Sequence, residues 1–283
     1  MVRLRRLLAG TTVMTLLLML LGVYTAAAGA GLTCQGRWPF CDGWLGLFPA
    51  NWMSFIEWFH RLVAMVTGFV ILGTTGLAWK RGADRRIRLG LLAAVVLLPI
   101  QIVLGAVTVT FSGLIPGGYA PPVQAAHYLT ALVIFGLLAS STALAYAPVD
   151  SRRRRQASLA ALALLPAMAL SSFGTLSSFG IPFPYTPEAQ ILHYSLALTV
   201  FALAVAAVVW AAAENRGQRL LSGLGASLVG FQMLLGRRLL GDPGPVLTDT
   251  VSLLTFACLL GAVWLAYRAD DARLPIVGSL AGR

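Results

Sequence analysis

Three histidines are the residues of this sequence best suited to hold a metal cofactor. His60, His127 and His193 each lie near the start of a long apolar segment. Because an ionisable side chain inside an apolar segment is costly to bury, its presence there predicts a function. Facing imidazoles on neighbouring helices typically hold a b-type haem through its iron, whereas zinc prefers four close ligands that often include cysteine or a carboxylate. The histidines therefore favour a haem site over a zinc site.

Glu57 is the acidic residue best placed for proton chemistry. It precedes His60 by one helical turn, which puts the carboxylate and the imidazole on the same face of a helix. There it can exchange a proton with a bound substrate or hydrogen-bond the imidazole. The alternative is an interfacial carboxylate that pairs with Arg61. We expect the chemical role, because Glu57 lies beside the predicted haem pocket.

Three arginines lie at the same ends of the predicted helices as the histidines. They are Arg61, Arg237 and Arg238. Haem carries propionate carboxylates, and arginine binds carboxylates through two parallel hydrogen bonds. Some of these arginines are therefore expected to clamp haem propionates. The alternative is that they extend to the membrane interface without a specific partner.

Cys34 and Cys41 flank a short loop that precedes Glu57. A disulfide can close a loop of this length, and conditions outside a bacterial inner membrane favour its oxidation. The pair is either structural or a redox-active pair that passes electrons or exchanges thiols near the site. The sequence favours neither. Cys258 lies in the last apolar segment and is expected to be a small apolar filler.

The composition places the chain in a membrane. Of its 283 residues 58% are hydrophobic and 11% charged, whereas a soluble domain carries about 25% charged residues. The apolar residues form blocks of about 20, the length that a helix needs to cross a bilayer, and such blocks are too long for barrel strands. The sequence predicts an all-α polytopic membrane protein with eight transmembrane helices, at approximately residues 8–28, 56–79, 89–110, 124–147, 157–175, 189–212, 220–236 and 247–267.

The basic residues set the predicted orientation. With the N-terminus inside, every lysine and arginine falls in an inner segment except Arg37, Arg61, Arg237 and Arg238. The net charge of +11 is thus a topology signal that also attracts anionic membrane lipid, and it does not indicate nucleic acid. We expect a multi-pass protein of the bacterial inner membrane with both termini cytoplasmic. The first span can also be read as a cleaved signal peptide, but we expect it to be retained because its counterpart in an internal repeat is a span.

An internal repeat divides the chain. A QxxLG motif begins at Gln101 and again at Gln232, and a QxxHY motif begins at Gln124 and again at Gln190. Because each unit has an even number of spans, both copies insert the same way and form a parallel repeat. The alternative is that apolar helices resemble one another by composition. We predict two four-helix bundles, in residues 1–150 and 151–283.

These motifs together resemble the haem A synthase family of the bacterial CtaA type. The resemblance extends over essentially the whole chain, with the same spans and two-unit repeat. The second half matches through His193, Gln232 and Gly236. The segments of the first half that carry it are GAGLTC at 29–34, RWPFC at 37–41, EWFHR at 57–61, QIVLG at 101–105 and QAAH at 124–127.

The resemblance implies an oxidoreductase that oxidises the C8 methyl of haem O to a formyl group through successive hydroxylations and loss of water from a geminal diol. The product is haem A for terminal oxidases. His60, His127 and Glu57 would then belong to the haem O site in the first unit. The family holds a resident haem b between two histidines of the second unit. The resemblance also implies a disulfide between Cys34 and Cys41.

The second unit departs from this pattern at one position. The spacing to Phe256 puts Thr248 where the histidine partner of His193 is expected. Three outcomes are open: His193 holds haem b alone, Asp249 or Met233 supplies the sixth ligand, or the unit has lost its haem and serves as scaffold. We expect a weakened or altered haem site.

Two other functions compete with the enzyme. One is a b-type membrane cytochrome or haem carrier, and the other is a non-catalytic paralogue in oxidase assembly. Glu57 favours the enzyme, since an electron carrier needs no acid beside the porphyrin, whereas Thr248 favours the paralogue. A transporter is disfavoured because mid-membrane charges and broken helices are missing from the sequence. Expected partners are haem O and haem A, haem O synthase, oxidase assembly proteins and membrane lipid, with no nucleic acid.

Overall fold

The computed structural model describes residues 2–34, 37–110, 121–171, 186–211, 215–236 and 244–271. Within these ranges the chain is helical and contains no strand. The short 3₁₀ turns η1 (Ala30–Leu32) and η2 (Trp44–Gly46) lie between the first two long helices. The long helices are α1 (Val2–Ala27), α2 (Trp52–Lys80), α3 (Arg85–Thr110), α4 (Pro121–Tyr146), α5 (Ser151–Leu170), α7 (Pro187–Trp210), α8 (Arg216–Gly236) and α9 (Gly244–Asp271).

Seven of these helices are long and apolar enough to cross a membrane. The exception is α5, whose first turn carries a run of arginines at 152–155 that lowers its mean hydropathy. Large apolar side chains such as Phe69, Val96 and Leu253 face outward, as they would toward lipid tails. The predicted all-α polytopic fold is confirmed, and the chain is a multi-pass membrane protein. Of the predicted fifth span, residues 172–175 lie outside the described residues.

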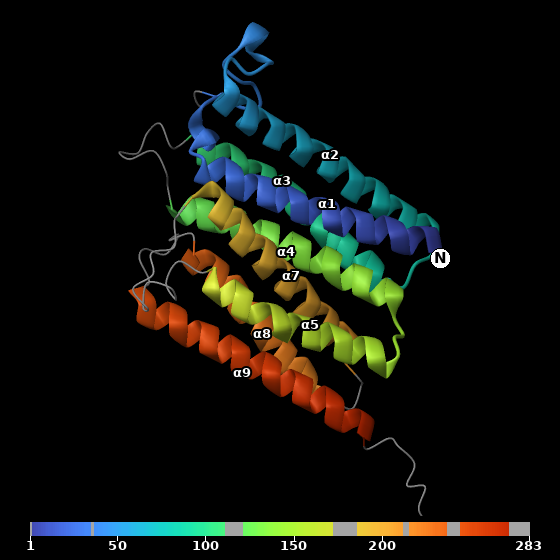
Figure 1. The fold of residues 1–283 in the computed structure, drawn as a ribbon. Coiled ribbons are helices and arrows are strands. Elements are labelled where there is room, and N and C mark those ends of the chain that lie inside the picture. Colours follow the sequence, from blue (N-terminus) through green and yellow to red (C-terminus); the bar gives the residue numbers. More distant parts are fainter. Residues whose placement is uncertain are drawn as a thin grey trace, which may run out of the picture.

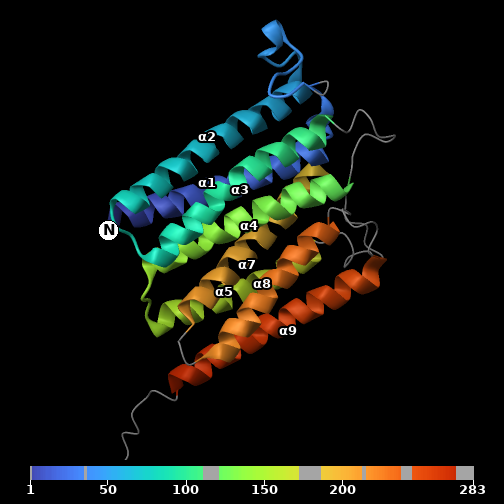
Figure 2. The same cartoon turned by 180° about the vertical axis from the view of Figure 1, so that it is seen from behind.

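The helices form two adjoining rings of four. In one ring α1, α2, α3 and α4 each contact the next, and α4 closes on α1; in the other α5, α7, α8 and α9 do the same. Figures 1 and 2 show α2 at one side of the molecule and α9 at the opposite side, with α4 and α7 between them. Helix α7 joins the rings by contacting both α1 and α4. That the rings are copies of one unit stays a prediction.

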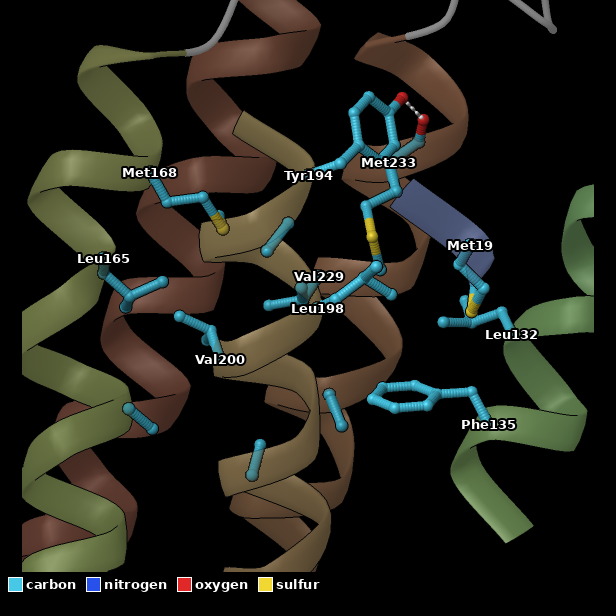
Figure 3. Packing of buried hydrophobic residues seen from close by; sticks show 14 of the residues in the cluster. Met19, Leu132, Phe135, Leu165, Met168, Tyr194, Leu198, Val200, Val229 and Met233 are labelled. Carbon is cyan, nitrogen blue, oxygen red and sulfur yellow. Dashed lines mark hydrogen bonds between the residues drawn. The ribbon is translucent and has the colours of Figure 1, made fainter. Parts of the chain in front are cut away.

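A buried cluster fills the junction between the rings. Figure 3 shows Met19 of α1, Phe135 of α4, and Tyr194 and Met233 of the second ring gathered there. The Tyr194 hydroxyl donates a hydrogen bond to the Met233 carbonyl, and Tyr128 of α4 donates one to the Met233 sulfur over 3.0 Å. The aromatic side chains of Tyr128 and Tyr194 also contact each other edge to face, with their centroids 5.8 Å apart. Since each tyrosine follows a histidine, this contact brings the segments that carry His127 and His193 close to each other.

Candidate functional site

The start of α2 is fixed by a side-chain cap. The Asn51 side chain accepts a hydrogen bond from the Ser54 amide over 3.0 Å, which satisfies one of the donors that a helix start leaves open. Glu57, His60 and Arg61 follow within the next turns. Glu57 is only 5% exposed, so its carboxylate needs a partner. That partner is Arg61, whose Nε donates to Glu57 Oε1 over 2.8 Å.

Arg61 also holds the loop that precedes α2. Its Nη1 donates to the carbonyl oxygens of Arg37 over 2.8 Å and of Phe40 over 2.7 Å. Its Nη2 is buried and has no hydrogen-bond partner among the described residues. The interfacial pairing of Glu57 with Arg61, one of the two alternatives from the sequence, is thus present. The contact with the loop carbonyls was not predicted, because backbone acceptors leave no mark in the sequence.

Cys34 and Cys41 lie at disulfide-bonding distance, with their Cα atoms 4.4 Å apart, and both are fully buried. Asp42 organises the return of this loop to α2. Its carboxylate accepts hydrogen bonds from the Ala50 amide over 3.0 Å and from the Ser54 hydroxyl over 2.8 Å. The bond from Ala50 is the main reason why the pKa of Asp42 lies below its ordinary value of 3.8. Asp42 was missed from the sequence, where only its place next to a cysteine could have drawn attention to it.

Asp42→Asn is expected to remove a pH-dependent part of the stability of this loop. Because the pKa in the folded protein lies below the ordinary 3.8, the carboxylate stabilises the fold fully above that value and loses its effect as the pH falls through the lowered pKa. The unfolding temperatures of wild type and variant in detergent should therefore differ near neutral pH and converge as the pH falls through this lowered pKa. A difference that stays constant with pH would contradict this role.

His60 of α2 and His127 of α4 both belong to the first ring. The imidazole of each histidine lies against a glycine of a neighbouring helix. A Cβ added to Gly22 of α1 would lie 3.1 Å from His60 Cε1, and one added to Gly105 of α3 would lie 3.2 Å from His127 Cε1. The Nδ1 atoms of both histidines are buried without a hydrogen-bond partner in the described part of the chain. Buried polar atoms of this kind suggest a site that binds something.

Gln101 connects the QxxLG motif to this pair. Its Nε2 lies 3.4 Å from His127 Nε2, while its own Oε1 is buried and unpaired among the described residues. Across the described ranges, no group of three or more His, Cys, Asp and Glu side chains is arranged to hold a metal ion directly. The site therefore offers two imidazoles and an amide, a donor set that suits a porphyrin iron better than a bare zinc ion.

His193 belongs to the second ring and is only 1% exposed. Its Nδ1 lies 3.2 Å from the Met168 carbonyl and 3.1 Å from the Ser171 hydroxyl, both of α5 and its C-terminal cap. Because a carbonyl can only accept, Nδ1 carries the proton in this contact. Nε2 lies toward α8, where a Cβ on Gly236 would lie 3.6 Å away. Metal-binding histidines commonly use a carbonyl in this way to orient the ligating nitrogen.

Thr248 lies on α9, at the position where the sequence predicts a histidine partner for His193. Its hydroxyl donates to the Gly244 carbonyl of its own helix over 3.0 Å. One turn away, Gln232 Nε2 donates a hydrogen bond to the Ser252 hydroxyl over 3.0 Å. In the first ring, the corresponding residue Gln101 lies beside His127 instead. The Met233 sulfur, proposed as a sixth ligand, already accepts a hydrogen bond from Tyr128.

Arg237 and Arg238 lie outside the described residues. Asp249 is half-buried on α9, next to Thr248. The described site therefore consists of the Glu57–Arg61 pair with the two histidines of the first ring, and of His193 with its contacts to α5 in the second.

Comparison with known proteins covers the same part of the chain. The model of the COX15-CtaA family, described as cytochrome oxidase assembly protein, matches residues 5–179. This range contains Glu57, His60 and His127, and it ends before His193.

Individual relatives are similar over shorter stretches. The haem A synthase of Bacillus licheniformis is 30% identical over 148 residues, which are 52% of this chain and 46% of the relative. That of Bacillus pumilus is 31% identical over 128 residues, 44% of this chain and 39% of the relative. The protohaem IX farnesyltransferase of Halobacterium salinarum is 36% identical over 122 residues, 43% of this chain and 26% of the relative. The chain thus spans from 26% to 46% of the length of these relatives.

Proposed function

The chain belongs to the COX15-CtaA family of cytochrome oxidase assembly proteins, and from this premise we propose that it is a haem A synthase. It would oxidise the C8 methyl group of haem O to the formyl group of haem A. The observation that carries the proposal is the presence of His60 and His127 in one ring of helices, each with a buried Nδ1 atom that has no hydrogen-bond partner among the described residues. The similarity to two haem A synthases supports the same assignment.

His60 and His127 would bind the substrate haem O between α2 and α4. The glycines at 22 and 105 leave room for the imidazoles against the neighbouring helices. Glu57, buried at the same end of α2, would give or take a proton as the methyl group is oxidised. Arg61 would hold that carboxylate in place, because the two are joined by a charge-assisted hydrogen bond.

The carboxylates of haem O need cationic partners at the same end. Arg61 can offer Nη2, since its Nε and Nη1 are engaged. Arg237 and Arg238 remain proposed partners from the sequence. Because Arg61 has little donor capacity left, we expect its contribution to haem O affinity to be small.

The second ring fits a resident haem b only in part. His193 is oriented as a ligand by the Met168 carbonyl, whereas the Thr248 hydroxyl bonds to its own helix. We propose an altered site in which His193 is the sole protein ligand. A haem b bound there would supply electron transfer to or from the substrate site.

Gly22→Val is expected to weaken haem O binding by roughly tenfold or more, since the added side chain would overlap the His60 imidazole and displace it from its place against α1. The measurement is a spectral titration of the purified protein with haem O. Gly10→Val on the same helix is the matched control, because nothing lies within 4 Å of a Cβ at that position. Equal affinities of the two variants would argue against His60 as a ligand.

The proposed setting is the bacterial inner membrane, with both termini cytoplasmic and the Cys34–Cys41 loop outside. Haem O synthase would supply the substrate and oxidase assembly proteins would receive the product. The similarity to part of a protohaem IX farnesyltransferase supports a partner that modifies the same class of haem.

The deciding experiment is co-expression with a haem O synthase, followed by extraction and chromatography of the haems. Accumulation of haem A that depends on this chain supports the enzyme. Unchanged haem O bound to the purified protein would instead support a haem carrier. Unchanged haem O with no haem bound would support a non-catalytic assembly factor, the alternative that Thr248 favours.

A further inference from the structure

The guanidinium of Arg61 connects the Glu57 carboxylate to the loop between Cys34 and Cys41. Arg61 binds the Glu57 carboxylate through Nε, and through Nη1 it binds the carbonyls of Arg37 and Phe40. Both carbonyls lie between Cys34 and Cys41, inside the loop that the two cysteines close. The link therefore runs from this loop, through a single side chain, to the carboxylate.

The loop is held to α2 at a second place, which does not touch Glu57. The Cys34 and Cys41 sulfurs lie 3.9 Å and 3.8 Å from the Ser54 carbonyl. The Ser54 hydroxyl also binds Asp42, just after the second cysteine. Opening the disulfide would thus leave the loop held near the start of α2 by Asp42, while the carbonyls that Arg61 binds could move.

The guanidinium transmits such a movement because it is rigid. Its donors are fixed in one plane, so a shift of the group that Nη1 binds also rotates Nε. A lysine in this position has a single ammonium group on a flexible chain and cannot impose the orientation of one partner on the other. The burial of Glu57 strengthens the dependence, since solvent cannot replace a lost partner.

We propose that Arg61 is a positioning residue that couples the Cys34–Cys41 disulfide loop to Glu57. With the disulfide closed, the loop carbonyls hold Arg61, and Arg61 holds the carboxylate toward the substrate. With the disulfide open, the carboxylate loses this orientation and turnover falls, while haem O still binds. The proposal rests on the proposed haem O oxidation.

The test is a double-mutant cycle between Arg61→Gln and the paired change Cys34→Ser with Cys41→Ser. Haem O affinity and the rate of haem A formation are measured for each protein. Arg61→Gln is expected to lower the rate by roughly tenfold or more with haem O affinity within about threefold of wild type. The cysteine change is expected to lower the rate less, and the combined variant should match Arg61→Gln alone, because both changes break one link.

Two controls separate positioning from charge and from general damage. Arg61→Lys keeps the positive charge but loses the planar set of donors that binds Glu57 and the loop together. Its rate of haem A formation should therefore be as low as that of Arg61→Gln. Arg37→Gln removes an exposed charge from the same loop but keeps the carbonyl that Arg61 binds, so its rate should match wild type. Rate losses that multiply in the combined variant, rescue by lysine, or a loss of haem O affinity that accounts for the lower rate would each overturn the proposal.

A second readout does not depend on activity. The rate at which a water-soluble phosphine reduces the disulfide of the folded protein reports how firmly the loop is held. Arg61→Gln should raise this rate roughly fivefold or more, and Arg37→Gln should leave it unchanged. If wild type makes no haem A, the proposed function fails, while this measurement still decides whether Arg61 holds the loop. Equal reduction rates in wild type and Arg61→Gln would refute the coupling.

Discussion

Glu57→Gln is expected to lower the formation of haem A from haem O by roughly 100-fold or more, the range lost when a general acid or base is removed. The amide has nearly the same shape as the carboxylate and can still accept the hydrogen bond from Arg61 Nε. The substitution therefore removes proton exchange and charge while it keeps the local packing. The protein should fold and bind haem O as wild type does.

The measurement is the ratio of haem A to haem O in membranes that also contain haem O synthase. The matched control is Glu188→Gln, which makes the same change at an exposed position in the first turn of α7. Its haem A content should equal that of wild type. If Glu57→Gln retained more than a few per cent of the wild-type ratio, Glu57 would have no part in proton transfer and would serve only as the partner of Arg61.

His127→Ala is expected to have the second largest effect, because it removes one of two imidazoles that would hold the substrate. Haem O affinity should fall by roughly 10- to 100-fold, as when a metal site loses a supporting group, and haem A formation should fall with it. The space vacated beside Gly105 matches an imidazole. Added imidazole is therefore expected to restore part of the haem O binding.

The measurement is a spectral titration with haem O, with and without imidazole, and His193→Ala is the comparison. The latter should leave haem O binding nearly unchanged, because His193 belongs to the other ring and is oriented by α5. Equal losses in the two variants would mean that they disturb one common site, and the assignment of the substrate to the first ring would be wrong.

Much of the fold follows from the sequence because membrane helices obey a simple rule of length and polarity. The QxxLG and QxxHY motifs also led to Gln101 and His127, which do contact each other. Helix α5 shows where this rule weakens, since the arginines at 152–155 lower its hydropathy although it packs against α7 and α9 like the others. Local spacing likewise predicted that Glu57 could pair with Arg61, since residues four apart on a helix are neighbours.

The rest of the site depends on groups that carry no sequence signal. The acceptors that orient Arg61 and His193 are backbone carbonyls, which every residue has. Gly22 and Gly10 are both glycines within one helix, yet only the first lies against an imidazole. Which glycine matters is decided by how α1 packs on α2, and no pattern within a single helix contains that information.

The contact of Tyr128 with Tyr194 and Met233 affects how the protein unfolds. These side chains belong to different rings but share one buried cluster, with a hydrogen bond from Tyr128 to the Met233 sulfur. Neither ring can lose its packing without exposing the inner surface of the other. Calorimetry should accordingly record a single heat-absorption peak for the two halves, and a cut of the chain between α4 and α5 should leave them associated.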